Sequence, residues 1–195
     1  MLSYDESLKI LKDTNALLEG HFVLSSGLHS SQYIQCAKLL SNPKEAQIIC
    51  SSLVEKILKN FKDIDIILSP AIGGIVVGYE VGRQLKVESI FAERVNKQLV
   101  LRRDFKIKKN SKVLIVEDVI TTGKSALECS ELIKLNKAIL LGYACIIDRT
   151  NENSLIKNNI TSQIKFSIKT YRESDLPKEL KKVKPSKPGS RDLSK

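Results

Sequence analysis

Hydrophobic residues at helical spacing predict two helices in the first third of the chain. A capping box, Ser3 with Glu6 three residues later, precedes apolar positions that line one side, and we expect Gly20 to end this helix. Asn42 and Pro43 mark a second start, a capping side chain followed by proline at the first helical position. The apolar positions that follow it predict that this helix also buries one face in a core.

Beyond these helices, short apolar runs alternate with helical patterns. We expect strands at 22–24, 32–36, 64–68, 90–93, 112–116, 138–147 and 164–168. Further helices are expected after the glycine-bearing turn at 69–74, as far as Arg83, and over 123–135. Strands that alternate with helices predict an α/β fold, with a mainly parallel twisted sheet and helices on both faces.

A basic segment precedes the strand expected at 112–116. Two short apolar arms, 99–101 and 105–107, flank the Arg-Arg-Asp sequence at 102–104. This pattern predicts a β-hairpin that carries its arginines away from the sheet.

Composition narrows the class of protein. The 195 residues are 42% hydrophobic and 28% charged, which fits a single folded domain and excludes wholesale disorder. No apolar run approaches the length of a membrane span, and the first twelve residues lack the pattern of a signal peptide. Four cysteines without a C-x-x-C pair, and only two histidines, exclude a zinc site of ordinary spacing. We therefore expect a cytoplasmic protein with buried thiols.

The net charge of +10 leaves the partner open. Part of the excess lies beyond Pro177, where Lys, Pro, Ser and Gly predict an extended basic tail over 177–195. Such a charge is typical of proteins that bind nucleic acid, of enzymes with a polyanionic small substrate, and of lysine-rich surfaces without a partner.

The strongest chemical signal is the segment 113–125. Four apolar residues run into Glu117 and Asp118, after which two threonines, a glycine and Ser125 lead into the expected helix. In an open parallel sheet, ligands bind beyond the carboxyl ends of the strands. Carboxylates suit sugar hydroxyls there, while hydroxyls and backbone N–H groups at a helix start suit a phosphate. A ligand with both a ribose and a phosphate accounts for the whole segment.

Two other interpretations of this segment are weaker. A nucleotide P-loop needs a glycine five places before Gly123, where Asp118 would instead repel a triphosphate. The segment could also be an ordinary strand–turn–helix with surface acids. Without a ligand or metal to neutralise them, two adjacent carboxylates at this position would lower the stability of the fold.

The segment closely resembles the phosphoribosyl pyrophosphate (PRPP) motif of type I phosphoribosyltransferases. The resemblance implies a parallel sheet flanked by helices, with a small N-terminal hood over the site. We accordingly expect the hood and N-terminal helix at 1–40 and the α/β core at 41–170 of one domain, 1–195. The implied PRPP-binding residues in this segment are Glu117, Asp118, Val119, Ile120, Thr121, Thr122, Gly123, Lys124 and Ser125.

A narrower resemblance, to orotate phosphoribosyltransferases, covers residues 20–191. Its motifs are the hood sequences at 20–27 and 33–35, the pyrophosphate loop at 69–74, the strand end at 147–149 and the tail at 187–191. It implies that Ala71, Ile72, Gly73 and Arg94 also bind PRPP, with a cis peptide between Ala71 and Ile72. It further implies that Thr121 and Arg149 bind orotate, and that Glu117, Asp118 and Arg103 are catalytic.

The same resemblance implies Mg²⁺ as cofactor, with no side chain assigned as a metal ligand, and a homodimer with shared active sites. A cationic lid for the pyrophosphate is expected from Arg94, Lys97, Arg102 and Arg103, of which the segment with Arg102 and Arg103 is expected to reach the neighbouring site. The implied reaction joins orotate to the ribose 5-phosphate of PRPP, without nucleic acid or a membrane as partner.

Two alternatives stay open at this point. Better-known orotate phosphoribosyltransferases carry lysines where this chain has Ser25 and Gly73, which leaves room for a purine or xanthine phosphoribosyltransferase. The positive charge leaves room for a phosphoribosyltransferase-like regulator that binds nucleic acid, although the basic residues are dispersed and no helix-turn-helix segment is visible.

Overall fold

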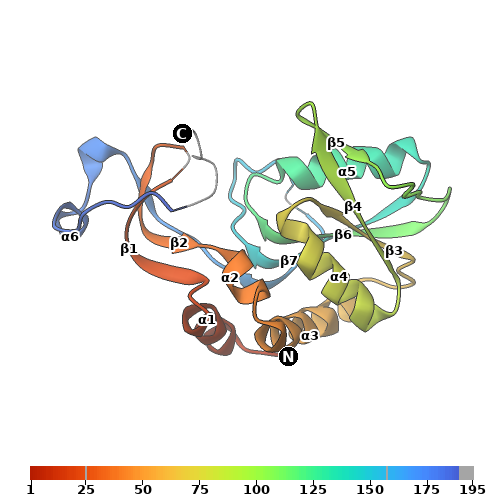
Figure 1. Cartoon of the computed structure of the whole chain (residues 1–195), viewed down its shortest axis with the longest axis horizontal. Helices are drawn as coiled ribbons and strands as arrows, with labels where there is room; N and C mark the ends of the chain where they lie inside the picture. Colours follow the sequence, from red (N-terminus) through yellow and green to blue (C-terminus); the bar gives the residue numbers. More distant parts are fainter. Residues whose placement is uncertain (25, 157, 189–195) are drawn as a thin grey trace.

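A computed structural model describes residues 1–24, 26–156 and 158–188, which form two sheets (Figure 1). The larger sheet has the order β5-β4-β3-β6-β7-β8 and the smaller one the order β1-β2-β9. The strands of the larger sheet are β3 (Ile66–Pro70), β4 (Glu88–Val95), β5 (Gln98–Leu101), β6 (Lys112–Ile120), β7 (Ile139–Asp148) and β8 (Ile160–Lys165). Those of the smaller sheet are β1 (Leu17–Val23), β2 (His29–Ile34) and β9 (Thr170–Tyr171).

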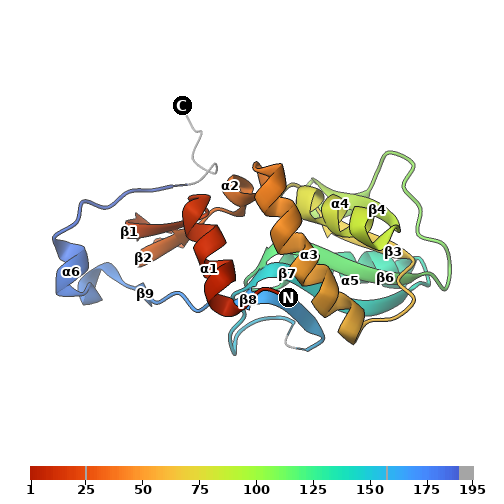
Figure 2. The ribbon, with the colours of Figure 1, turned by 90° about the horizontal axis from the view of Figure 1, so that it is seen from below.

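The larger sheet confirms the predicted α/β fold. Its strands are parallel except for β5, which pairs antiparallel with β4. The helices are α1 (Tyr4–Asp13), α2 (Cys36–Leu40), α3 (Pro43–Asn60), α4 (Gly73–Leu85), α5 (Lys124–Leu135) and the short α6 (Lys178–Lys181). Figure 2 shows α3 and α4 together on one face of the sheet.

Side chains of each strand alternate between two hydrophobic cores. In β3, Ile67 joins the core beneath α3 and α4, whereas Ile66 and Leu68 join the core beneath α5. In β6, Leu114 and Ile115 divide in the same way. Because both faces are covered, these strands are apolar throughout, which is why the sequence shows them as continuous hydrophobic runs.

The first helix is shorter than predicted. Its capping box is present, with the Ser3 hydroxyl and the Glu6 carboxylate each accepting the other residue's backbone N–H. The helix ends at Asp13 rather than near Gly20, because Asn15 takes a left-handed φ of 54° and the chain turns into β1. Gly20 lies within β1, where the pairing with β2 is irregular. Pairing with a distant strand therefore outweighs the local helical pattern.

The predicted hairpin exists, but its arms and tip were misplaced. It consists of β4 and β5, and its turn is formed by Asn96 and Lys97, both with a left-handed φ. Such a turn matches the twist of antiparallel strands. The expected second arm, 105–107, is not a strand; Phe105 in this segment packs edge-on against Phe91, with ring centroids 5.1 Å apart.

The tail is not simply extended and the hood is not confined to residues 1–40. Thr170 and Tyr171 pair with β2, so the hood sheet draws its third strand from beyond the expected core. The backbone of Ser186 donates to His21 O and accepts from Val23 N, both at 2.8 Å. The tail folds back because the open edge of β1 offers these partners; residues 189–195 of the expected tail lie outside the described part of the chain.

The predicted burial of the thiols is confirmed. All four cysteines are buried and free. His21 and His29 are buried with 2.7 Å between His21 Nε2 and His29 Nδ1, and His21 Nδ1 donates to Val183 O at 2.8 Å. Among the described residues, none of the helices combines the length and the apolar character needed to cross a membrane.

The order of the strands creates the site. From β3 the chain continues through α4 to β4 on one side, whereas β6 lies on the other side of β3 and leads through α5 to β7. These connections leave in opposite directions, so a crevice opens between the carboxyl ends of β3 and β6.

Candidate active site

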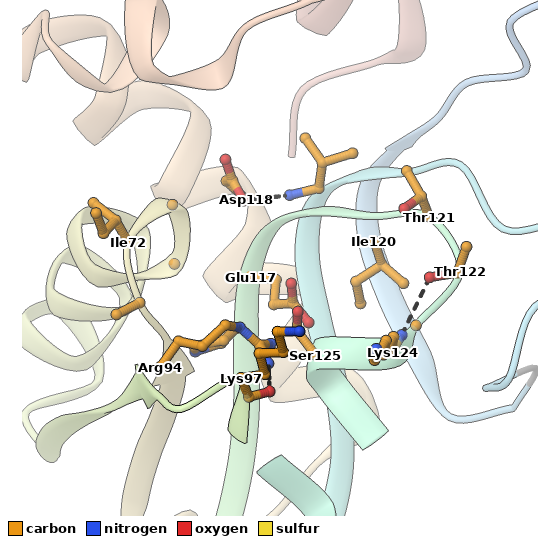
Figure 3. Close-up of a pocket in the computed structure, with 16 residues that line it drawn as sticks. Ile72, Arg94, Lys97, Glu117, Asp118, Ile120, Thr121, Thr122, Lys124 and Ser125 are labelled. Carbon is orange, nitrogen blue, oxygen red and sulfur yellow. Dashed lines mark hydrogen bonds between the residues drawn. The ribbon is translucent and has the colours of Figure 1, made fainter. Parts of the chain in front are cut away.

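A cavity of about 910 Å³ occupies this crevice (Figure 3). It is lined by residues 117–125 from the end of β6 to the start of α5, by the loop 70–74 after β3, and by Arg94 and Lys97 of the hairpin. The structure thus brings together every predicted PRPP-binding residue.

Two carboxyl groups that are adjacent in the sequence line the cavity, Glu117 and Asp118 of β6. Burial, together with the neighbouring Asp118, raises the pKa of Glu117 to about 8. Burial also raises the pKa of Asp118, although its Oδ1 accepts a hydrogen bond from Val119 N at 2.9 Å, which works in the opposite direction. Burial makes the ionised pair costly, and a ligand that brings hydroxyl donors or positive charge makes it favourable.

The turn from β6 to α5, residues 121–125, is the predicted phosphate site and is called the cradle below. Gly123 takes a left-handed φ of 75°, and no side chain caps the helix that begins at Lys124. The Thr122 hydroxyl accepts only a long hydrogen bond, 3.4 Å, from Lys124 N. An uncapped helix start with hydroxyls around it offers N–H and O–H donors to a phosphate.

The loop after β3 forms the opposite wall. The peptide bond between Ala71 and Ile72 is cis, as the family resemblance implied. A Cβ atom at Gly73 would lie 2.8 Å from both carboxylate oxygens of Asp118, so no side chain fits there unless Asp118 moves. Glycine rather than lysine at position 73 lets the loop lie close to Asp118. The other position without the expected lysine, Ser25, lies outside the described residues.

The hairpin arginines are divided between two places. Arg94 lines the cavity, with its Nη1 2.8 Å from Glu128 Oε2 of α5, and Nη1 also donates to Lys97 O at 2.6 Å. Arg103 and Arg102 instead pair with Glu93, at 2.6 and 3.4 Å, and are absent from the cavity wall. A catalytic role for Arg103 within its own subunit is not supported by this geometry, so that role stays a prediction for a neighbouring subunit's site.

The two residues predicted to bind orotate line two different pockets. Thr121 lines the main cavity, and Arg149 lines a smaller pocket of about 170 Å³ just beyond β7. Arg149 N donates to Ile120 O at 2.8 Å, which fixes this residue beside the cradle. Among the described residues, the buried Nε of Arg149 has no hydrogen-bond partner, and burial lowers the pKa of the guanidinium.

Comparisons with known proteins identify the family. A family model described as a phosphoribosyl transferase domain matches residues 36–174. The chain is 43% identical over 192 residues to an orotate phosphoribosyltransferase of Caldicellulosiruptor bescii, covering 97% of this chain and 99% of the relative. The chain belongs to the orotate phosphoribosyltransferase family. A relative of the same name from Parvibaculum lavamentivorans is 41% identical over 194 residues, with 99% and 100% of the two chains covered.

Solved structures agree on the fold of this family. The orotate phosphoribosyltransferase of Aeropyrum pernix superposes with a TM-score of 0.71 at 24% identity, covering 81% of this chain and 92% of that one. An adenine phosphoribosyltransferase superposes with a TM-score of 0.64 at 20% identity, covering 83% and 100%. Since enzymes named for different bases share the architecture, the fold alone does not distinguish the base.

Sequence reasoning missed the residues that support this phosphoribosyltransferase site from outside. Glu128 lies on α5 in an ordinary amphipathic pattern, and nothing in that pattern indicates its contact with Arg94. Ser154 and Leu155 lie in a polar loop after β7 and hydrogen-bond the carbonyls of the cradle. No local signal could have identified them, because both contacts join segments that are distant in the sequence.

Proposed function

We propose that this chain transfers the ribose 5-phosphate of PRPP to orotate, giving orotidine 5′-monophosphate and pyrophosphate in pyrimidine biosynthesis. The observation that carries the proposal is the adjacency, in one cavity, of a buried acidic pair and an uncapped helix start. A ribose that bears a 5′-phosphate matches that order of groups, and the full-length relatives named above are orotate phosphoribosyltransferases.

The acidic pair acts on the ribose. Glu117 and Asp118 accept hydrogen bonds from its hydroxyls, and their negative charge stabilises the positive charge that develops on the ring as pyrophosphate departs. N1 of orotate then bonds to C1 of the ribose as the bond from C1 to the pyrophosphate oxygen breaks, and the proton of N1 passes to the departing pyrophosphate or to water. Because this acceptor comes with the substrates, the chain need not supply a strong base. Most of the acceleration comes from positioning and electrostatics.

The two phosphate ends of PRPP have different partners. The cradle, 121–125, holds the 5′-phosphate through its N–H and hydroxyl groups. The loop 70–74 and Arg94 lie across the cavity, where they meet the departing pyrophosphate. Arg94 adds positive charge on that side, and such charge stabilises the leaving group.

Orotate is bound by Arg149 and Thr121. A guanidinium matches the planar carboxylate and ring oxygens of orotate, since its fork can donate two parallel hydrogen bonds. The buried Nε without a partner within the described residues supports this role, because such a group is costly until a ligand accepts from it.

The donor set of the cavity fits Mg²⁺ that arrives with the substrate. The described residues contain no group of three or more His, Cys, Asp or Glu side chains that could hold a metal by themselves. Mg²⁺ suits a site of this kind, because oxygens of PRPP and water can complete its shell while Glu117 and Asp118 contribute negative charge nearby. When bound, the ion neutralises charge on the pyrophosphate.

We further propose that the enzyme works as a cytoplasmic homodimer. Ile72, Val76 and Tyr79 expose 85%, 49% and 64% of their surface along one side of α4, beside the cavity. An apolar ridge of this kind suits an interface with a second copy. The free buried cysteines fit a reducing compartment.

A panel of bases tests the proposed reaction. The protein is incubated with PRPP, Mg²⁺ and one base at a time, and consumption of the base is followed by absorbance. We expect turnover of orotate and none of hypoxanthine, xanthine, adenine or uracil. Turnover of a purine in place of orotate would contradict the proposal.

A further inference from the structure

The segment 151–156 forms a wall behind the phosphate cradle. The Ser154 hydroxyl, on a residue only 4% exposed, donates to Thr121 O at 2.9 Å. Leu155 N donates to Thr122 O at 2.8 Å. Ile156 fills the remaining space, since a Cβ atom added at Gly123 would lie 2.5 Å from its Cγ1. Two consecutive carbonyls of the cradle are thus held from the side opposite the cavity.

These contacts determine where the cradle's N–H groups point. A trans peptide unit is planar, with its C=O and N–H in opposite directions. Holding Thr121 O and Thr122 O therefore directs the N–H groups of Thr122 and Gly123 away from the wall. The described residues supply no hydrogen-bond acceptor for either N–H. Both residues line the cavity, so both donors are left for a ligand.

Ser154 is placed to organise the whole wall. Its oxygen accepts from Asn151 N at 3.0 Å while its hydrogen is donated to Thr121 O. The same stretch of chain begins at Arg149, whose N–H is donated to Ile120 O. One continuous segment therefore contacts the cradle and also carries the arginine assigned to orotate.

We propose that Ser154 is a positioning residue for the 5′-phosphate of PRPP. Through Thr121 O it holds the cradle backbone in the orientation that binds phosphate, without contacting the substrate itself. The proposal rests on the function proposed above for this site. It predicts that loss of the hydroxyl weakens ligands that carry the 5′-phosphate and spares ligands that bind only at the pyrophosphate side.

The test compares two ligands by calorimetry. In Ser154→Ala, we expect ribose 5-phosphate to bind about 3- to 10-fold more weakly, the loss typical of one net hydrogen bond, with a similar rise in KM for PRPP. Pyrophosphate binding and kcat should change by less than about twofold. Ser154→Cys keeps a side chain of similar size whose thiol donates weakly, so it should disturb folding less than Ser154→Ala. Its affinity for ribose 5-phosphate should lie between those of the wild type and Ser154→Ala.

Ser7→Ala is a matched control. Ser7 is also buried, and its hydroxyl donates to Ser3 O and accepts from Gln163 Nε2, both at 2.8 Å, in α1. Ser7→Ala should lose about as much thermal stability as Ser154→Ala, while its affinities for ribose 5-phosphate and pyrophosphate stay unchanged. Two results would overturn the proposed role of Ser154 and leave the proposed function intact. In both Ser154→Ala and Ser154→Cys, either ribose 5-phosphate and pyrophosphate would bind more weakly to the same degree, or the affinity for ribose 5-phosphate would be unchanged. A wild-type protein that binds no ribose 5-phosphate would overturn the proposed function as well.

Discussion

At the scale of single residues, the site is defined by charges held where water is scarce. Glu117 is 9% exposed, and the charge of the adjacent Asp118 opposes its ionisation. Arg149 is half-buried and has a buried donor atom without a partner among the described residues. Such groups lower stability in the free protein and are retained where a ligand compensates them.

The raised pKa of Glu117 makes a prediction about stability. Its pKa of about 8 in the folded protein lies above the ordinary value of 4.5, so the folded state keeps a proton that the unfolded state releases. Stability should therefore fall as the pH rises from about 4.5 to about 8. Glu117→Gln removes this loss, and we expect its Tm to exceed that of the wild type by about 10 °C at pH 9.

This difference should shrink as the pH falls towards 4.5, which melting curves at several pH values would measure. Glu152→Gln, at an exposed position in the loop after β7, controls for the loss of one carboxylate. A gain in Tm that is the same at every pH would show that the gain does not come from the ionisation of Glu117. Activity should fall in Glu117→Gln at every pH, because a neutral amide stabilises ring charge poorly.

Arg149 makes a prediction about substrate recognition. Arg149→Ala should raise KM for orotate by about 10- to 150-fold, the cost of a charge-assisted pair, and should leave KM for PRPP nearly unchanged. Steady-state kinetics with each substrate varied in turn would measure both constants. Equal losses for the two substrates would instead indicate a general distortion of the site.

At the scale of elements, the turn between β6 and α5 concentrates the groups that we propose bind phosphate. Thr122→Val and Ser125→Ala each remove one hydroxyl from the cradle. Both should weaken PRPP and orotidine 5′-monophosphate together by about 3- to 10-fold, because the two ligands share the 5′-phosphate. Pyrophosphate lacks that group, and its affinity measured by calorimetry should hardly change. The reverse order would mean that the cradle holds the other end of PRPP.

The β4–β5 hairpin divides its positive charge between the cavity and the outer surface. Arg94 and Lys97 line the cavity of their own chain, whereas Arg102 and Arg103 are paired with Glu93. Arg103 is 62% exposed and lies with its guanidinium carbon 5.7 Å from the centre of the Phe91 ring. Its location leaves it available to a neighbouring subunit rather than to its own site.

At the scale of the whole molecule, this arrangement predicts complementation between subunits. Arg103→Ala and Asp118→Asn should each be nearly inactive alone. Arg103→Ala removes the arginine that is proposed to act in the neighbouring subunit's site, and Asp118→Asn neutralises one member of the acidic pair. In a mixed dimer, one site combines both changes and the other has neither. Random exchange makes about half of the dimers mixed, so activity should recover to about one quarter of the wild type.

Subunit exchange has to be confirmed separately, for example with differently tagged chains. If exchange occurs and mixing restores no activity, Arg103 does not act in a neighbouring site. Tyr79→Asp would place a charge on the exposed ridge of α4, and under this proposal it should shift the dimer towards monomer in gel filtration.

The sequence by itself determined the layers of the fold and the identity of the cavity-lining residues. Strands buried on both faces, such as β3 and β6, are continuously apolar, so they can be predicted from the sequence without knowing which strands lie beside them. The segment 117–125 lines one cavity, as the sequence predicted, because a strand end, a turn and a helix start are consecutive in the chain. The resemblance carried by its motifs also implied the cis peptide in the opposite wall.

Only the tertiary structure decided which distant groups meet. The end of α1, the turn of the hairpin and the path of the tail all depend on strand pairing between remote segments, which outweighs local propensity. The pairing of Arg103 with Glu93 and of Arg94 with Glu128 follows from that register. The support of the cradle by Ser154 depends on a contact across 33 positions of the chain, for which no local pattern exists.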